Sequence, residues 1–305
     1  MKIKLVEVGP RDGLQSQAVA LPTAAKLDLI GRLVAAGVRR LEVASFVNVQ
    51  KVPQMADAEA LFAALPVQPG VSYIGLVLNR RGYERARLAG CREVGMVVVA
   101  SDTFNRRNQG VGTEQSIDTW LEIAAAARDD GIAVNVTISA AFGCPFEGEV
   151  DPARVVEIAE RCARGEPLEL AIADTVGVGV PTQVSDLVGR LHESVPDLPL
   201  RAHFHNTRNV GIANAYAAVQ AGVQSLDASI GGIGGCPFAP AATGNIPSED
   251  LVYMLDRMGI ETGVSIPAMI ETSQWLEKQI GTSMPGMVMK AGLFPRAMAE
   301  TRDEK

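Results

Sequence analysis

The sequence predicts an α/β fold, a (β/α)8 TIM barrel with an extra C-terminal helical segment. Runs of apolar and β-branched residues, typical of buried parallel strands, alternate along the chain with amphipathic helical patterns. Eight strand patterns, each followed by a helical pattern, favour a closed barrel over an open doubly wound sheet. The length of 305 residues also suits a barrel, which typically takes about 250. We expect one catalytic domain over 1–305, in which about 266–305 form a C-terminal extension.

The elements follow in a regular order along the chain. The expected strands cover 3–8, 39–45, 71–78, 93–100, 133–140, 168–173, 200–205 and 224–230. The expected helices cover 23–36, 54–64, 80–89, 114–130, 151–163, 181–194, 209–221 and 248–258, and a final helix covers about 266–280. Thr23 and Asp151 stand at helix starts as N-caps, and glycines mark four helix ends, at Gly37, Gly90, Gly131 and Gly222.

Composition excludes several classes of protein. A net charge of −7 argues against a nucleic-acid surface and against a polybasic membrane patch. Apolar runs stay shorter than the roughly 18 residues that span a bilayer, and residues 1–8 resemble a strand, not a signal peptide. The four cysteines form neither a CxxC metal pair nor a disulfide framework. We therefore expect a cytoplasmic protein with reduced thiols and no nucleic-acid or membrane partner.

The densest chemical signal is the pair His203 and His205, two of only three histidines. On a strand, positions i and i+2 face the same side, so both imidazoles converge on one point, an arrangement suited to a divalent metal. Active sites of this fold lie at the C-terminal ends of the strands. The polar residues expected there are Arg11, Asp12, Glu42, Ser45, Asp102, Asp174, Thr175, His203, His205, Asn245 and the loop cysteine Cys236. Asp12, the two histidines and the Asn245 amide oxygen form a mixed N/O set suited to Mg²⁺, Mn²⁺ or Zn²⁺.

Each signal also has a simpler interpretation. The histidines could be hydrogen-bonded core residues, and Arg11 with Asp12 could be a local ion pair at a strand end. The glycine run 231–235 could be a tight turn, although its density of glycines suggests a loop that flexes or lets backbone approach a ligand. Gly-Cys-Pro-Phe occurs twice, at 143–146 and 235–238, so pattern alone leaves open which cysteine is chemically active.

Several longer motifs resemble 3-hydroxy-3-methylglutaryl-CoA lyase, within the wider group of metal-dependent barrel lyases and acyl-CoA condensing synthases. The motifs, in chain order, are VEVGPRDGLQ at 6–15, SFV at 45–47, VPQM at 52–55, GCPFEG at 143–148, DTVGVG at 174–179, the run 231–245 and EDLVYML at 249–255. The resemblance covers roughly residues 3–265, and the cysteine loop is particularly specific to the lyase branch.

The resemblance implies a role for each position. Asp12, His203, His205 and Asn245 match metal ligands, and Arg11 matches the arginine that stabilises the developing enolate. Glu42 and Asp174 match acidic residues of the catalytic pocket, His203 or Asp174 could serve as the base, and Cys236 matches the cysteine that closes over the substrate. The implied reaction is a retro-Claisen cleavage of an acyl-CoA thioester with Mg²⁺ or Mn²⁺, in leucine degradation or ketone-body-type metabolism. The implied assembly is a homodimer.

Three positions depart from the lyase pattern, and one of them is Ser16, which stands where the similar lyases have asparagine. Asn206 stands where the similar lyases have aspartate, and Arg208 stands where they have tyrosine. Arg208 could bind a substrate carboxylate or a CoA phosphate, or could be a surface arginine paired with an acid. These departures keep open a second substrate, another 3-hydroxy-3-alkyl acyl-CoA. A condensing synthase is the third interpretation, and the Cys236 loop argues against it.

Overall fold

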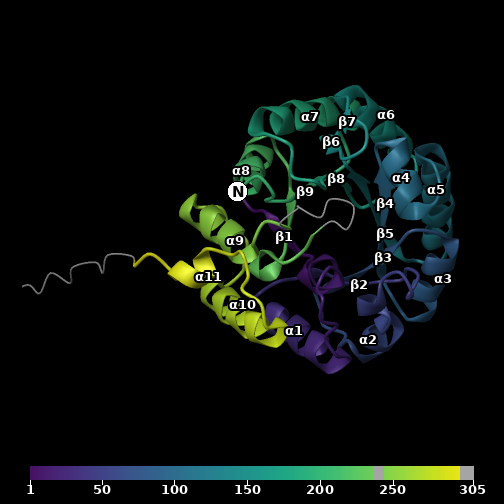
Figure 1. Cartoon of the computed structure of the whole chain (residues 1–305). Coiled ribbons are helices and arrows are strands. Elements are labelled where there is room, and N and C mark those ends of the chain that lie inside the picture. The colour runs from purple at the N-terminus through teal and green to yellow at the C-terminus, as the bar shows by residue number, and fades with distance from the viewer. Residues whose placement is uncertain (236–243, 296–305) are drawn as a thin grey trace, which may run out of the picture.

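The computed structural model describes residues 1–235 and 244–295. Within this part of the chain, eight parallel strands close into a barrel, in the order β1-β10-β9-β8-β5-β4-β3-β2. Figure 1, viewed along the barrel, shows the helices as a ring around these strands. The predicted (β/α)8 fold is confirmed.

Each barrel strand coincides with one of the eight predicted strand patterns. The strands are β1 (Lys4–Glu7), β2 (Arg40–Ser45), β3 (Ser72–Val77), β4 (Glu93–Val99), β5 (Ala133–Ser139), β8 (Leu170–Asp174), β9 (Leu200–Phe204) and β10 (Ser225–Ala228). Every residue of β8, β9 and β10 is buried, as expected of strands that face a barrel interior on one side and helices on the other.

The predicted helices are present with small shifts at their ends. They are α1 (Thr23–Ala35), α2 (Ala58–Ala64), α3 (Arg80–Leu88), α5 (Thr113–Asp129), α6 (Pro152–Ala163), α7 (Pro181–Ser194), α8 (Gly211–Gln220), α9 (Ser248–Arg257) and α10 (Ile266–Ile280). Asp151 caps α6 by accepting a hydrogen bond from the amide of Ala153. The predicted cap at Thr23 is wrong, since Pro22 is the N-cap and the Thr23 hydroxyl instead donates to Asp57 at 2.8 Å.

Some elements were not predicted from the sequence. They are helix α4 (Asp102–Gln109), a short turn of 3-10 helix η2 (Pro53–Met55), the two-stranded hairpin β6 (Gly143–Cys144) and β7 (Gly148–Glu149), and helix α11 (Val288–Ala291). The polar helix α4 directly follows β4 and brings Phe104 and Gln109 into the wall of the main pocket. All but α11 lie within the barrel connections, where two residues of strand or one turn of helix leave little periodicity to detect.

The C-terminal segment packs beside the start of the chain. Helices α10 and α11, yellow in Figure 1, lie next to α1 and α9. Beyond α10, the Gly286 amide donates to the carbonyl of Gly231 at 3.0 Å, and the amides of Met287 and Val288 donate to the Asp250 carboxylate. The segment after α10 is therefore fastened to the turn that follows β10.

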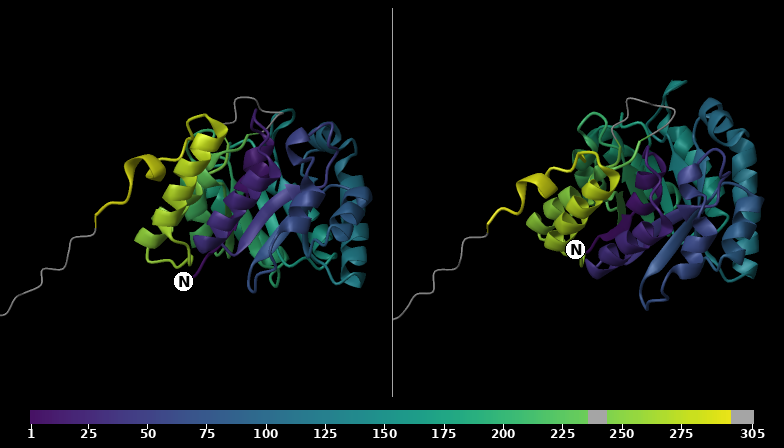
Figure 2. Two further views of the ribbon diagram at one scale, coloured as in Figure 1. Left: turned by 90° about the horizontal axis from the view of Figure 1, so that it is seen from below. Right: turned by 60° about the horizontal axis from the view of Figure 1, so that its bottom comes forward.

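The strands point their C-terminal ends toward one end of the barrel. Figure 2 shows the N-terminus at the opposite, lower end in both views. The barrel therefore gathers the loops after the strands at one end, where the predicted site residues lie.

In the described residues, no helix combines the length and the apolar character needed to cross a membrane.

Candidate active site

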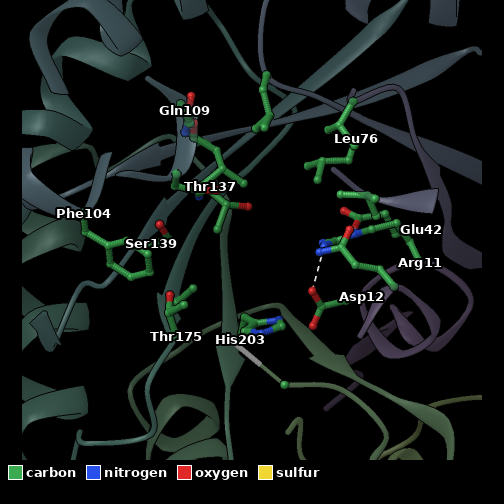
Figure 3. A pocket seen from close by; sticks show the side chains of 18 of the residues that line it. Arg11, Asp12, Glu42, Leu76, Phe104, Gln109, Thr137, Ser139, Thr175 and His203 are labelled. Atoms are coloured by element: carbon green, nitrogen blue, oxygen red, sulfur yellow. Dashed lines mark hydrogen bonds and ion pairs between the residues drawn. The ribbon is translucent and has the colours of Figure 1, made fainter. Parts of the chain in front are cut away.

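A pocket of about 450 Å³ opens at the C-terminal end of the barrel. Figure 3 shows Arg11, Asp12 and Glu42 on one side of it, Phe104, Ser139 and Thr175 on the other, and His203 between them. The other lining residues that matter below are Lys51, Arg107, Gln109, Thr137, Arg201, His205 and Asp227. Of the predicted site residues, Arg11, Asp12, Glu42, His203 and His205 thus share one pocket.

Asp12, His203 and His205 form a group suited to a metal ion, because one potential ligand atom of each lies within 4.8 Å of the others. Asn245 joins this group, since its side-chain NH₂ donates to Asp12 Oδ2 at 2.8 Å. Asn245 Oδ1 and His205 Nδ1 are both buried and have no hydrogen-bond partner in the described structure. Unsatisfied buried acceptors are costly, and a divalent cation would satisfy them. The donor set of imidazole nitrogens with carboxylate and amide oxygens fits such a cation.

The backbone explains how distant residues reach this point. After β1 the chain forms a single turn of π-helix, η1 (Gly9–Gly13), in which the amides of Arg11, Asp12 and Gly13 all converge on the Val8 carbonyl. This turn directs Arg11 and Asp12 into the barrel mouth. An isolated antiparallel bridge pairs His205 with Asn245, which brings the chain after the glycine run back to the end of β9.

The buried Glu7 side chain connects the turn after β1 with the turn after β10. Its carboxylate accepts from the Gly9 amide at 2.8 Å and from the Ile230 amide at 2.9 Å, and the Ser248 hydroxyl donates to its second oxygen at 2.5 Å. The start of η1 is thereby connected to η3 (Ile230–Gly232), the 3-10 turn that begins the glycine run. Burial raises the pKa of Glu7 to about 8, against the opposing effect of these donors.

Arg11 is held by two carboxylates. It forms ion pairs with Glu42 and, at 2.6 Å, with Asp12. Burial alone would favour the neutral form of Asp12, but the charges of Arg11 and the two histidines outweigh it and lower the Asp12 pKa to about 2. Asp12 is therefore an anion at neutral pH, as a metal-binding carboxylate must be.

The two histidines differ in their surroundings. His203 Nδ1 lies 3.1 Å from Asp227 Oδ2, and this contact raises the His203 pKa although burial opposes the charged form. His205 has no such partner, so burial, with the neighbouring His203, lowers its pKa to about 4. A neutral His205 imidazole can coordinate a cation at neutral pH.

The carboxylates of two predicted site residues, Asp174 and Asp102, accept hydrogen bonds from backbone amides. Asp174 accepts from the amides of Val178 and Gly179, each at 2.9 Å, and so shapes the loop after β8; burial nevertheless raises its pKa. Asp102 pairs with Arg106 on the surface of α4 and accepts from the Thr113 amide. Neither of these acids is among the residues that line the pocket.

Arg208 is exposed and donates to the carbonyls of Val176 and Gly177, at 3.1 and 2.8 Å. It pairs with no acid in the described structure, contrary to one of the two sequence interpretations. Of the two Gly-Cys-Pro-Phe cysteines, Cys144 is buried on β6, accepts a hydrogen bond from the Ser101 hydroxyl at 2.8 Å and does not line the pocket. Cys236 lies outside the described residues.

Sequence reasoning missed Asp227 and Arg201. Both are buried, line the pocket and form an ion pair, with Arg201 Nε 3.4 Å from Asp227 Oδ1. A signal was present, because charged residues inside predicted barrel strands are unusual where branched apolar residues are expected. Alternation along β9 places Arg201 on the same face as His203, whereas only the register between β9 and β10 places Asp227 opposite it.

Similarity to known proteins identifies the family of this chain. Residues 2–276 match the HMGL-like family. The chain belongs to the HMGL-like family. One HMGL-like relative, the (R)-citramalyl-CoA lyase of Chloroflexus aurantiacus, is 44% identical over 97% of this chain and 97% of its own length. The hydroxymethylglutaryl-CoA lyase of Pseudomonas mevalonii is 40% identical, over 92% of this chain and 93% of its own.

A solved HMGL-like structure superimposes closely on the barrel. It is an HMG-CoA lyase from Acinetobacter baumannii in complex with coenzyme A and 3-methylmalate, with a TM-score of 0.92 and 37% identity, over 97% of this chain and 98% of that one. These HMGL-like relatives are all named as lyases, and this protein is a lyase of the same family.

Proposed function

We propose that this protein cleaves 3-hydroxy-3-methylglutaryl-CoA to acetyl-CoA and acetoacetate, with a divalent cation, Mg²⁺ or Mn²⁺. The observation that carries the proposal is the convergence of Asp12, His203 and His205 within 4.8 Å, inside a pocket that Arg11 also lines. The complex of a solved relative with coenzyme A supports an acyl-CoA thioester as the substrate class.

A second substrate of the same class is (R)-citramalyl-CoA. The relative named for that substrate has 44% identity to this chain. Both thioesters carry a hydroxyl and a methyl group on C3 and end in a carboxylate, and they differ by one methylene in the carboxylate branch. One methylene in an apolar pocket changes specificity by only about 10- to 200-fold, so the same site could cleave both.

The bound cation would be held by Asp12, His203, His205 and the Asn245 amide oxygen, and it would lower the pKa of a hydroxyl that it binds. The substrate's tertiary 3-hydroxyl, itself a very weak acid, must lose its proton before C2–C3 cleavage. Asp174 accepts hydrogen bonds from loop amides and does not line the pocket, whereas His203 and Glu42 both line it. His203 is already assigned to the cation, and Glu42, which is paired with Arg11, is not. We assign proton acceptance to Glu42 and a loop-positioning role to Asp174.

When the C2–C3 bond breaks, C3 becomes a carbonyl carbon. The electron pair of the broken bond stays with C2, so the thioester fragment leaves as an enolate. The Arg11 guanidinium, fixed between Glu42 and Asp12, is placed to stabilise the enolate oxygen without reorganisation. The enolate carbon then takes a proton to give acetyl-CoA. On the family resemblance we propose that the Cys236 thiol supplies it, since a thiol pKa near 8.5 suits this acid role.

Further parts of the proposal rest on the sequence. A single catalytic domain and a cytoplasmic location rest on its pattern and composition, and a homodimeric assembly and a place in leucine degradation rest on the resemblance.

The test is steady-state cleavage of both thioesters with Mg²⁺ or Mn²⁺, beside an EDTA control and Cys236→Ala. Acetyl-CoA forms from either substrate, whereas acetoacetate marks the first and pyruvate marks the second. Fast metal-dependent release of acetoacetate, strongly reduced in Cys236→Ala, would support the first assignment. Pyruvate release at a much higher kcat/KM would transfer the assignment to citramalyl-CoA, and absence of turnover with both would refute the proposal.

A further inference from the structure

Asp227 occupies the position beside His203 that controls the histidine's orientation. Strands β9 and β10 pair in parallel with Asp227 opposite His203, so both side chains face the barrel interior together. Asp227 Oδ2 lies 3.1 Å from His203 Nδ1. A carboxylate can only accept, so Nδ1 carries the hydrogen, and in the neutral imidazole Nε2 then retains its lone pair. That nitrogen is then free to act as a ligand in the group with Asp12 and His205.

Asp227 is itself held by a chain of buried charges. Arg201 Nε lies 3.4 Å from Asp227 Oδ1, and Arg201 Nη1 donates to Glu169 Oε1 at 2.9 Å. Glu169 also pairs with Arg40, whose Nε donates to Glu93 at 2.9 Å. We name these five residues, Asp227, Arg201, Glu169, Arg40 and Glu93, the core charge chain.

Burying the core charge chain in the barrel interior costs free energy. Barrel interiors are usually packed with branched apolar side chains, and each buried ion carries a large desolvation penalty. Arg201 is 2% exposed and Asp227 is 5% exposed, so water contributes little to compensate them. Folding alone therefore gives no reason for the charges, whereas anchoring the carboxylate beside His203 does.

We propose that Asp227 is a positioning residue that, anchored by Arg201, fixes His203 with Nδ1 protonated and Nε2 directed at the Asp12–His205 group. The inference rests on the metal-dependent function proposed above, because it assigns Nε2 as the ligand atom of His203. Outer partners that orient a metal-binding histidine typically account for 10- to 100-fold in metal affinity or activity.

The first measurement is the Mn²⁺ affinity of Asp227→Asn, determined from the electron paramagnetic resonance signal of free Mn²⁺. We expect the Kd for Mn²⁺ to rise by about 10- to 100-fold and kcat to fall, while KM for the thioester changes little. The matched control is Asp186→Asn, the same substitution at an exposed aspartate of α7 that pairs with Arg190 outside the pocket and the core charge chain. Its Mn²⁺ affinity is expected to match that of the wild type. Wild-type Mn²⁺ affinity in a folded Asp227→Asn protein would overturn the proposal.

A second measurement needs no variant, in case Asp227→Asn fails to fold. The chain has only three histidines, so ¹⁵N-histidine labelling gives few imidazole signals to assign by NMR. We expect His203 in the Nδ1–H tautomer, with its Nε2 resonance shifting when Mg²⁺ is added. An Nε2–H tautomer, or a metal-induced shift larger at Nδ1 than at Nε2, would refute the inference. Both measurements are independent of turnover, so they decide on Asp227 even if neither thioester is a substrate.

Discussion

The side-chain amide of Asn245 donates to Asp12 Oδ2 at 2.8 Å, joining the turn after β1 to the chain that follows the glycine run. The same amide also donates to the Ile233 carbonyl at 3.1 Å. With its NH₂ engaged twice, the Asn245 side chain has a fixed orientation, and its carbonyl oxygen is the atom left without a partner. This orientation leaves the Asn245 oxygen available for the metal-ligand role proposed above.

Replacing Asn245 by Ala should weaken Mn²⁺ binding by about 10- to 100-fold or more, since it removes both a ligand oxygen and the amide that holds Asp12. Isothermal titration with Mn²⁺ checks this. Asn206→Ala is the control, because Asn206 lies next to His205 and its side-chain oxygen accepts from the Gly211 amide, outside the ligand group. Equal Mn²⁺ affinities in the two variants would contradict the role of Asn245.

Arg11→Met should lower kcat by about 10²- to 10³-fold, the effect of removing one donor that stabilises a developing oxyanion. Glu42 and Asp12 hold the guanidinium in place before the substrate binds, so Arg11→Lys, which cannot reproduce the planar fork, should be only partly active. Arg106→Met serves as the control, since Arg106 is exposed and pairs with Asp102 outside the pocket. A kcat within a factor of a few of wild type in Arg11→Met would remove Arg11 from the mechanism.

The opening of the pocket carries two exposed cations, Lys51 and Arg107, the latter lying 4.0 Å over the Phe146 ring. Coenzyme A carries phosphates, so Lys51→Ala and Arg107→Ala should each raise the thioester KM by up to about 5-fold, as for exposed ion pairs of about 0.2–1 kcal/mol. The increase should shrink at high salt, because screening weakens such pairs. Steady-state kinetics at low and high salt test this, with the α7 variant Arg190→Ala as control. No change in KM at low salt would place the phosphates elsewhere.

The barrel itself could be predicted from the sequence because its strands are continuous apolar runs and its helices are amphipathic. The metal group could also be anticipated, since His203 and His205 share a face by simple alternation, and Asp12 follows the first strand. These inferences need only local patterns and one rule of the fold.

The partners of these residues could not be predicted in the same way. Asp227 reaches His203 through the register between β9 and β10, and Asn245 reaches Asp12 across 233 residues. Asp174 was expected in the pocket, but whether its carboxylate turns to a ligand or to the amides of its own loop depends on loop conformation. These contacts depend on the tertiary structure, and residue type alone does not determine them.

The last prediction concerns stability and pH. Burial raises the pKa of Glu7 to about 8 and that of Glu249 to about 7, far above the ordinary value of 4.5. Between pH 4.5 and these values the folded protein retains protons that the unfolded chain releases. Each group therefore stabilises the fold fully below pH 4.5, and this contribution is lost as the pH rises, by up to about 1.4 kcal/mol per pH unit. For Glu7 the loss extends to about pH 8.

Glu7→Gln should flatten this dependence, because its amide keeps an acceptor for Gly9 and Ile230 and carries no titratable proton. Urea unfolding of wild type and variant across pH 5–8 measures the difference in slope. We expect the variant to gain stability relative to wild type as the pH rises toward 8, and the exposed α5 variant Glu122→Gln to follow wild type throughout. Parallel curves for wild type and Glu7→Gln would mean that Glu7 ionises normally in the folded protein. In that case its three donors, and not its burial, would control its charge.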